Sequence, residues 1–204
     1  MIISLILAAG VSTRFGFNKL LFRFNGKELI RSTVENALNS IVDRVVVITG
    51  FMKEYIEEVL RDLNIEFVHN PRYVEGMSSS IVTGIEYVLS KYNRIVDALT
   101  ITPGDCGWIN SNTYNQLILY YREKTIVKPV ILIPHYHGQR GHPILFSRDL
   151  FYELKNISES TYGLKKVVKE YSCFIRLINV NDPGVVLDID CFNDINRVKY
   201  FIKK

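Results

Sequence analysis

A chain of 204 residues is long enough for one domain with a substantial hydrophobic core and too short for two ordinary domains, so residues 1–204 are expected to form a single domain. Hydrophobic residues make up 48% and charged residues 23% of the sequence, which excludes a disordered chain, and no apolar run reaches the roughly 18–20 residues that span a bilayer. The net charge of +4 comes from dispersed basic residues, so neither a nucleic-acid nor a membrane partner is expected. Three scattered cysteines fit the reducing cytoplasm.

The first element is an apolar run over residues 2–7, broken only by Ser4, which predicts a strand buried on both faces. It leads into a polar loop with Gly10 and Gly16, and such a loop leaves backbone N–H groups free to approach an anion closely. Arg14 and Lys19 add two cations to the same loop. The loop therefore suits a polyphosphate better than a neutral ligand.

The sequence of this loop distinguishes between the known glycine-loop motifs. It lacks the G-x-x-x-x-G-K-[ST] of a P-loop and, because Gly10 and Gly16 are six residues apart, the G-x-G-x-x-G of dinucleotide-binding proteins. It does resemble the signature L-A-A-G-x-S-x-R-x-G-x-x-K of nucleotidyltransferases that attach an NMP to a phosphate-bearing acceptor, and every specified position is present. The resemblance implies a nucleotide-binding role for Leu7, Ala8, Ala9, Gly10, Ser12, Arg14 and Lys19.

The elements after the loop alternate between strands and helices. A strand over 20–24 and the turn dipeptide Asn25-Gly26 precede a helix over 30–41, a strand over 44–49, a helix over 56–63 and a strand over 65–68. Later elements are a strand over 95–101, a helix over 113–121, strands over 130–134 and 144–146, helices over 151–154 and 164–171, and a strand over 174–178. This order predicts a three-layer α/β domain.

The segment 70–81 leads into an apolar stripe that predicts a helix starting near Ser78. The three serines there either cap the free N–H groups of the helix or present hydroxyls and amides to a ligand at the positive end of the helix dipole. The run Asn-Pro-x-x-x-x-Gly-Met-Ser-Ser-Ser closely resembles the second motif of the molybdenum-cofactor cytidylyltransferase branch of the family, which favours the ligand. By that resemblance Asn70, Gly76 and Ser79 are expected to bind the nucleotide.

Asp105 follows the strand over 95–101, beyond the carboxyl end, where ligands of open parallel sheets bind. From the residues alone, its carboxylate either caps the next turn or serves a ligand. The family places its magnesium-binding Asp here in a Gly-Asp-x-Pro motif, and this chain departs from that motif by carrying Gly107 in place of the proline. The resemblance therefore implies Mg²⁺ as the cofactor, held by Asp105.

Three histidines between residues 135 and 142 lie close together, but they show no recognisable zinc-site spacing. The run Gly-x-Arg-Gly-His-Pro over 138–143 resembles instead the third signature of the family, on a hairpin at the acceptor side of the cleft. The resemblance implies that Arg140 and His142 contact the acceptor.

The end of the chain carries a fourth element, because residues 188–194 resemble the family's Asp-Ile-Asp-Thr-Pro-x-Asp run before its last helix. Asp188 and Asp190 alternate on an extended segment and so point the same way, which lets them help hold a divalent ion. Capping of the terminal helix accounts for Asp190 or Asn193 equally well.

Four motifs in the proper order make the chain similar to molybdenum-cofactor cytidylyltransferases and to MobA-like nucleotidyltransferases in general. The resemblance implies a Rossmann-like nucleotidyltransferase fold of the nucleotide-diphospho-sugar transferase type, with a mostly parallel sheet. It also implies that the enzyme joins CTP to the phosphate of a molybdopterin-type acceptor and releases pyrophosphate. In that reaction Arg14, Lys19 and Asp105 would be catalytic, because displacement at phosphorus demands positioning and charge neutralisation.

Several alternatives remain open at this point. The guanylyltransferase branch reads Leu-Ala-Gly-Gly and Arg-Met-Gly where this chain has Ala9 and Phe15, and related chains use sugar phosphates as acceptors. A nucleotide-binding module without catalysis is supported only by the altered turn after Asp105. A nicotinamide-dependent oxidoreductase is disfavoured, since both G-x-G-x-x-G and a ribose-binding acid after the second strand are missing. The sequence does not indicate an oligomeric state.

Overall fold

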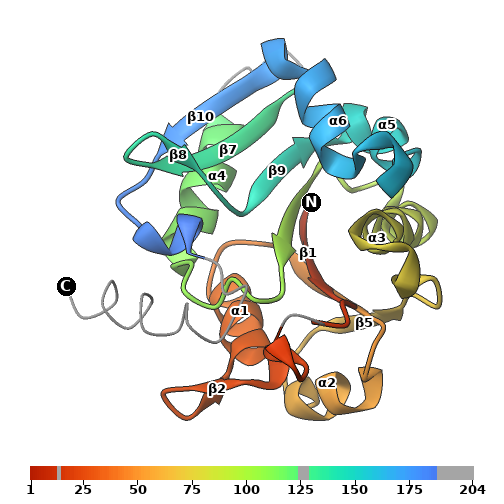
Figure 1. Cartoon of the computed structure of the whole chain (residues 1–204). Helices are drawn as coiled ribbons and strands as arrows, with labels where there is room; N and C mark the ends of the chain where they lie inside the picture. Colours follow the sequence, from red (N-terminus) through yellow and green to blue (C-terminus); the bar gives the residue numbers. More distant parts are fainter. Residues whose placement is uncertain (13–14, 124–128, 188–204) are drawn as a thin grey trace.

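A central sheet of eight strands organises the computed structural model, which describes residues 1–12, 15–123 and 129–187 (Figure 1). The strands are β1 (Ile2–Ala8), β4 (Arg44–Thr49), β5 (Glu66–His69), β6 (Ala98–Pro103), β7 (Ile131–Tyr136), β8 (Gln139–Arg140), β9 (Ile144–Ser147) and β10 (Ile175–Asn179). Their order is β10-β7-β9-β6-β1-β4-β5, with β8 paired to β7. The pairs β1–β4, β1–β6, β4–β5 and β7–β10 are parallel, whereas β9 runs antiparallel to both neighbours. The predicted α/β fold with a mostly parallel sheet is confirmed.

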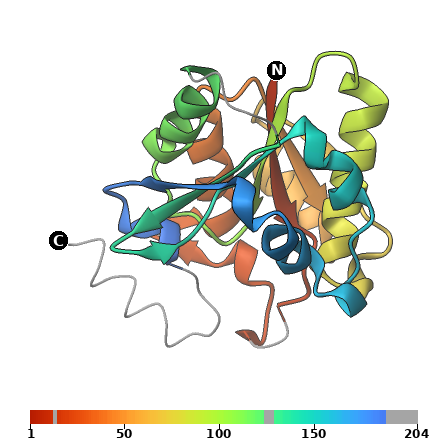
Figure 2. The ribbon, with the colours of Figure 1, turned by 90° about the horizontal axis from the view of Figure 1, so that it is seen from above.

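Helices cover both faces of this sheet and produce three layers (Figure 2). They are α1 (Leu29–Leu38), α2 (Lys53–Leu60), α3 (Met77–Tyr92), α4 (Ser111–Glu123), α5 (Phe151–Lys155) and α6 (Gly163–Glu170). Side chains of β1 alternate between the faces, as a strand requires. Leu5 and Leu7 pack in the cluster that contains α3, α5 and α6, whereas Ile6 packs in the cluster that contains α1, α2 and α4. No helix in the described part of the chain combines the length and the apolar character needed to cross a membrane.

The expected strand over 20–24 is wrong in its first half. Lys19–Leu21 forms one turn of 3-10 helix, and the side chain of Asn18 accepts a hydrogen bond from the backbone N–H of Leu20 at 3.1 Å. A local side-chain acceptor of this kind stabilises a turn against an extended chain. Only β2 (Arg23–Phe24) is extended, and it pairs with β3 (Lys27–Glu28) across the predicted turn.

The strand expected over 95–101 begins later, at Ala98. The backbone N–H groups of Ile95 and Val96 both donate to the carbonyl of Tyr92, so these two residues continue the turn that ends α3. Their apolar side chains matched a strand pattern, but their hydrogen bonds belong to the helix terminus. The strand also ends two residues later than expected, at Pro103, and Asp105 follows its carboxyl end after Gly104.

Candidate active site

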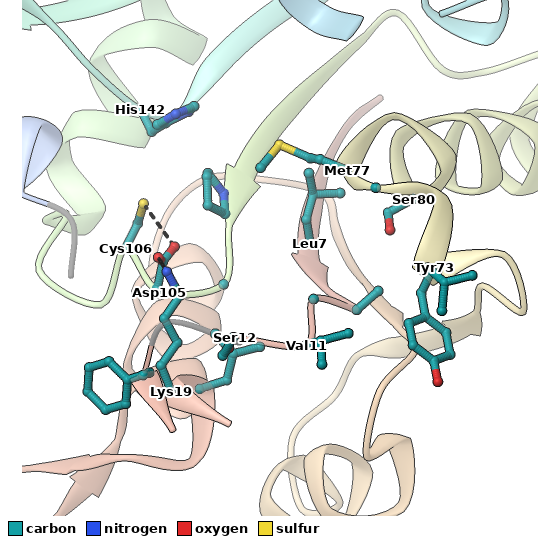
Figure 3. Close-up of a pocket in the computed structure, with 18 residues that line it drawn as sticks. Leu7, Val11, Ser12, Lys19, Tyr73, Met77, Ser80, Asp105, Cys106 and His142 are labelled. Carbon is teal, nitrogen blue, oxygen red and sulfur yellow. Dashed lines mark hydrogen bonds and ion pairs between the residues drawn. The ribbon is translucent and has the colours of Figure 1, made fainter. Parts of the chain in front are cut away.

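A cavity of about 570 Å³ lies at the carboxyl ends of β1 and β6 (Figure 3). Its walls come from four parts of the chain: the loop after β1 with Lys19, the residues around the start of α3, the turn after β6, and His142 of the hairpin after β7. This is the edge of an open parallel sheet at which ligands bind. Of the expected site residues, it brings together Leu7, Ala9, Gly10, Ser12, Lys19, Gly76, Asp105 and His142.

Residues 9–12 of the loop after β1 line this cavity. Gly10 has open space around it, since a Cβ there would meet nothing within 4 Å. Ala9 instead is 3% exposed and packs on Gly50, where a Cβ would lie only 2.7 Å from the methyl group of Ala9. Ala8 is fully buried beneath the loop and does not line the cavity.

The floor of the cavity holds an ion pair between Lys19 Nζ and Asp105 Oδ2. Both side chains are largely buried, with 20% of Lys19 and 10% of Asp105 exposed. Figure 3 shows the ammonium and the carboxylate meeting, with the thiol of Cys106 on the other carboxylate oxygen at 4.0 Å. The cavity therefore presents an ammonium group and a carboxylate side by side.

The turn after Asp105 is held on α1. The hydroxyl of Thr33 donates to the carbonyl of Gly104 at 2.8 Å, and the amide of Asn36 donates to the carbonyl of Gly107 at 3.0 Å. A Cβ at Gly107 would lie 3.1 Å from the carbonyl oxygen of Leu29. The residue that replaces the expected proline therefore sits against the start of α1, with little room for a ring.

The second wall is formed by Tyr73, Gly76, Met77 and Ser80, around the start of α3. Two expected nucleotide ligands lie behind it instead of lining it. Asn70 is fully buried and donates to the hydroxyls of Ser79 and Ser80 at 2.8 and 3.1 Å. The hydroxyl of Ser79 donates to the carbonyls of Arg72 and Gly76, and so ties the wall together.

None of the serines caps α3 with its side chain. Gly76 occupies the N-cap position, and the backbone N–H of Ser78 donates to the carboxylate of Glu159 at 2.8 Å. The capping interpretation is therefore wrong about which group caps the helix. The sequence contained no sign of Glu159, because it lies 81 residues further along the chain.

His142 lines the cavity, whereas Arg140 is exposed on β8 and is not among the residues that line the cavity. The backbone N–H of His142 donates to the carbonyl of Val185 at 3.0 Å. A Cβ at Gly141 would lie only 1.9 Å from that carbonyl oxygen, so a side chain there is excluded. The hairpin is thereby clamped by the segment Pro183–Val186.

Asp182, which precedes that segment, was also missed. Its carboxylate accepts from the backbone N–H of Asn110 at 2.8 Å, the hydroxyl of Thr113 at 2.6 Å and the backbone N–H of Gly184 at 2.9 Å. It joins the segment after β10 to the start of α4. The only available signal was an Asp before a proline-containing turn, which is common in loops.

Other expected site residues fall on parts of the chain outside the described residues. These are Arg14, Asp188 and Asp190. Among the described residues that line the cavity, Asp105 supplies the carboxylate, and no group of three or more described His, Cys, Asp or Glu side chains is arranged to hold a metal.

Comparison with known proteins gives a consistent result. A sequence model described as the MobA-like NTP transferase domain matches residues 4–174. The molybdenum cofactor cytidylyltransferase of Escherichia coli (strain K12) is 24% identical over 96% of this chain and 94% of its own length. A probable molybdenum cofactor guanylyltransferase of Thermococcus sibiricus is 24% identical over 97% of each chain.

Solved structures agree on the fold. Rv0371c from Mycobacterium tuberculosis H37Rv superimposes with a TM-score of 0.78 at 24% identity, over 97% of this chain and 96% of that one. The complex of Rv0371C with manganese superimposes with a TM-score of 0.75 at 23% identity, over 97% of both chains. With a family match over most of its length and a mostly parallel nucleotidyltransferase sheet, the chain belongs to the MobA-like NTP transferase domain family.

Proposed function

We propose that this nucleotidyltransferase moves CMP from CTP to the phosphate of a molybdopterin-type acceptor and releases pyrophosphate. The observation that carries the proposal is the pairing of Lys19 and Asp105 on the floor of the cavity. In-line displacement at phosphorus needs charge neutralisation and positioning more than a covalent nucleophile. A cation and a carboxylate side by side, below an open glycine loop, supply both.

The loop after β1 is proposed to bind the triphosphate. Backbone N–H groups over residues 9–12, which line the cavity, would cradle its oxygens, as in other concave backbone anion sites. Lys19, together with Arg14, would stabilise the charge that passes onto the leaving pyrophosphate. Gly10 suits this task because the space beside its Cα is open.

Asp105 is proposed to hold Mg²⁺, a cation whose chemistry is to bridge phosphate oxygens and offset their charge. The side chain fits such an ion, since Mg²⁺ prefers oxygen ligands and is usually bound through one or two carboxylates plus substrate phosphates. Asp105 Oδ1 lies 4.0 Å from the weak thiol donor of Cys106. Asp188 and Asp190 remain the candidates for further carboxylate ligands.

The α3 wall is proposed to receive the base and the ribose, with Gly76 and Ser80 in contact and Asn70 and Ser79 holding them in place. His142 is proposed to contact the acceptor. Arg140 lies on the same hairpin but is exposed, so its proposed contact is with a part of the acceptor that extends out of the cavity.

GTP is the second candidate nucleotide, because full-length relatives include both a cytidylyltransferase and a probable guanylyltransferase. We favour CTP because Ala9 and Phe15, the two positions that differ from the guanylyltransferase branch, are both among the residues that line the cavity. A cytoplasmic location is expected of such an enzyme and agrees with the few, scattered cysteines.

A thermal-shift panel of the four NTPs with Mg²⁺ tests the nucleotide, because a ligand that binds only the folded state raises the melting temperature by mass action. We expect CTP to give the largest shift. Pyrophosphate release from CTP, with and without a molybdopterin-type acceptor, then tests the transfer. A rate of pyrophosphate release that does not change when the acceptor is added contradicts the proposed reaction. A larger increase in melting temperature with GTP than with CTP assigns the enzyme to guanylyl transfer.

A further inference from the structure

The short segment between α5 and α6 folds back onto the start of α3. A capping box joins Ser158 and Thr161, with Glu159–Thr161 forming one turn of 3-10 helix between them. Tyr162 and Gly163 follow with left-handed φ angles of 62° and 51°, which reverse the chain into α6. This tight turn carries the side chain of Glu159 to the end of α3 that borders the cavity.

The carboxylate of Glu159 makes two hydrogen bonds there. Its Oε1 accepts from the backbone N–H of Ser78 at 2.8 Å and from the hydroxyl of Ser78 at 2.9 Å. The contact between Glu159 and the start of α3 leaves no room for a side chain at Gly76 or at Gly163. A Cβ at Gly76, whose φ is 102°, would lie 2.5 Å from Glu159 Cγ, and a Cβ at Gly163 would lie 2.7 Å from the hydroxyl oxygen of Ser78.

These contacts determine what the start of α3 can do. A helix of 16 residues carries a partial positive charge at its first turn, which attracts anions. In this protein the carboxylate of Glu159 already occupies that position. A triphosphate directed there would meet a negative charge, whereas at the opposite end of the cavity it meets Lys19.

We propose that Glu159 is a positioning residue for the nucleotide: it fixes the wall formed by Gly76, Met77 and Ser80 for the base and ribose, and it keeps the phosphates at the Lys19 end. The inference rests on the proposed nucleotidyl transfer. Glu159 itself does not line the cavity, so it acts through the wall and not by touching the substrate.

The test compares Glu159→Ala and Glu159→Gln with wild type and with Glu170→Gln, a matched control on α6 whose exposed carboxylate lies 3.9 Å from Lys166. Binding of Mg·CTP is measured by calorimetry, and kcat and both KM values by pyrophosphate release. Losing hydrogen bonds to a charged group predicts a rise of about tenfold in the Kd and the KM for CTP of Glu159→Ala. Its kcat at saturating CTP and its KM for the acceptor should stay at wild-type values. Glu159→Gln keeps an acceptor oxygen and should show a smaller rise.

Three outcomes would overturn the inference. They are an unchanged Kd for CTP in Glu159→Ala, a parallel change in kcat and both KM values, and the same change in Glu170→Gln. If Glu159→Ala does not fold, the isosteric Glu159→Gln decides by the same criteria. A wild-type protein that binds no NTP would overturn the proposed function as well, whereas normal wild-type binding with unaffected variants would overturn the role of Glu159 alone.

Discussion

Removing the ammonium group of Lys19 changes both the chemistry and the stability of the site. In Lys19→Ala the carboxylate of Asp105, with 10% of its side chain exposed, loses the cation that it contacts. A buried carboxylate without a charged or hydrogen-bonding partner raises the free energy of the folded state. We therefore expect the variant to fold, with a lower free energy of unfolding and much lower activity.

The burial of the pair sets the size of the stability loss. Two unit charges about 4 Å apart interact by about 4 kcal/mol at an effective dielectric constant of 20. Breaking a fully buried pair costs about 3–5 kcal/mol, while an exposed pair is worth about 0–1 kcal/mol. Lys19 is 20% exposed, so the pair lies between these limits. We expect Lys19→Ala to lower the free energy of unfolding by about 2 kcal/mol.

The loss of activity should be larger. Removing one preorganised group that stabilises developing charge typically lowers kcat by about 10²–10³-fold. Pyrophosphate release at saturating CTP measures this loss, and urea unfolding measures stability. Lys53→Ala is the matched control, because its side chain is 39% exposed and its ammonium lies 4.0 Å from the exposed carboxylate of Glu54.

A double-mutant cycle with Asp105→Asn separates the pair from its surroundings. If Lys19 and Asp105 stabilise each other, the double variant should be less destabilised than the sum of the single variants, by about 1 kcal/mol or more. Asp105→Asn should also abolish the response of activity to Mg²⁺. Additive stability losses would refute the ion-pair argument, and normal transfer by Lys19→Ala would remove Lys19 from the mechanism. A retained Mg²⁺ response in Asp105→Asn would place the metal elsewhere.

Three further predictions concern other parts of the molecule. Asp182→Ala leaves three donors without their acceptor and should lower the free energy of unfolding by about 2–4 kcal/mol in urea titrations, whereas an unchanged midpoint would refute this role. Ala9→Gly combined with Phe15→Met should weaken the preference for CTP over GTP in competition assays, within the roughly 10–200-fold that a methylene-sized contact provides; a wild type that prefers GTP contradicts the prediction. Hydrogen bonding to Arg31 lowers the pKa of Asp62 from 3.8 to about 2. The ionised carboxylate of Asp62 therefore stabilises the folded state above pH 3.8, and this stabilisation is lost as the pH falls toward 2. Asp62→Asn should therefore lose less stability than wild type over that pH range in urea titrations, and an equal loss would contradict the assignment.

The layout of the binding edge follows from local patterns in the sequence. The apolar run of β1, the polar glycine loop after it and the Asp directly after β6 each show in a few consecutive residues. Parallel strands present their carboxyl ends at one edge of the sheet, so the segments that follow β1 and β6 were expected at that edge. The structure then showed that Lys19 and Asp105 form an ion pair there. Hydrophobic periodicity indicates which residues of a segment are buried. This pattern is sufficient to predict most of the strands and helices in their order along the chain.

Tertiary structure alone decided which side chains line the cavity and which support it. Asn70 and Ser79 match a nucleotide-binding motif as well as Gly76 does, yet they lie behind the wall. The groups that support the walls come from distant parts of the chain. The carboxylate of Glu159 accepts a hydrogen bond from the backbone N–H of Ser78, 81 residues away, and that of Asp182 accepts one from the backbone N–H of Asn110, 72 residues away. Such contacts leave no periodic pattern, because they depend on where two distant turns meet once the sheet and its helices have packed. The sequence by itself determined the family and the edge of the sheet that carries the site, while the packing of remote segments determined its walls.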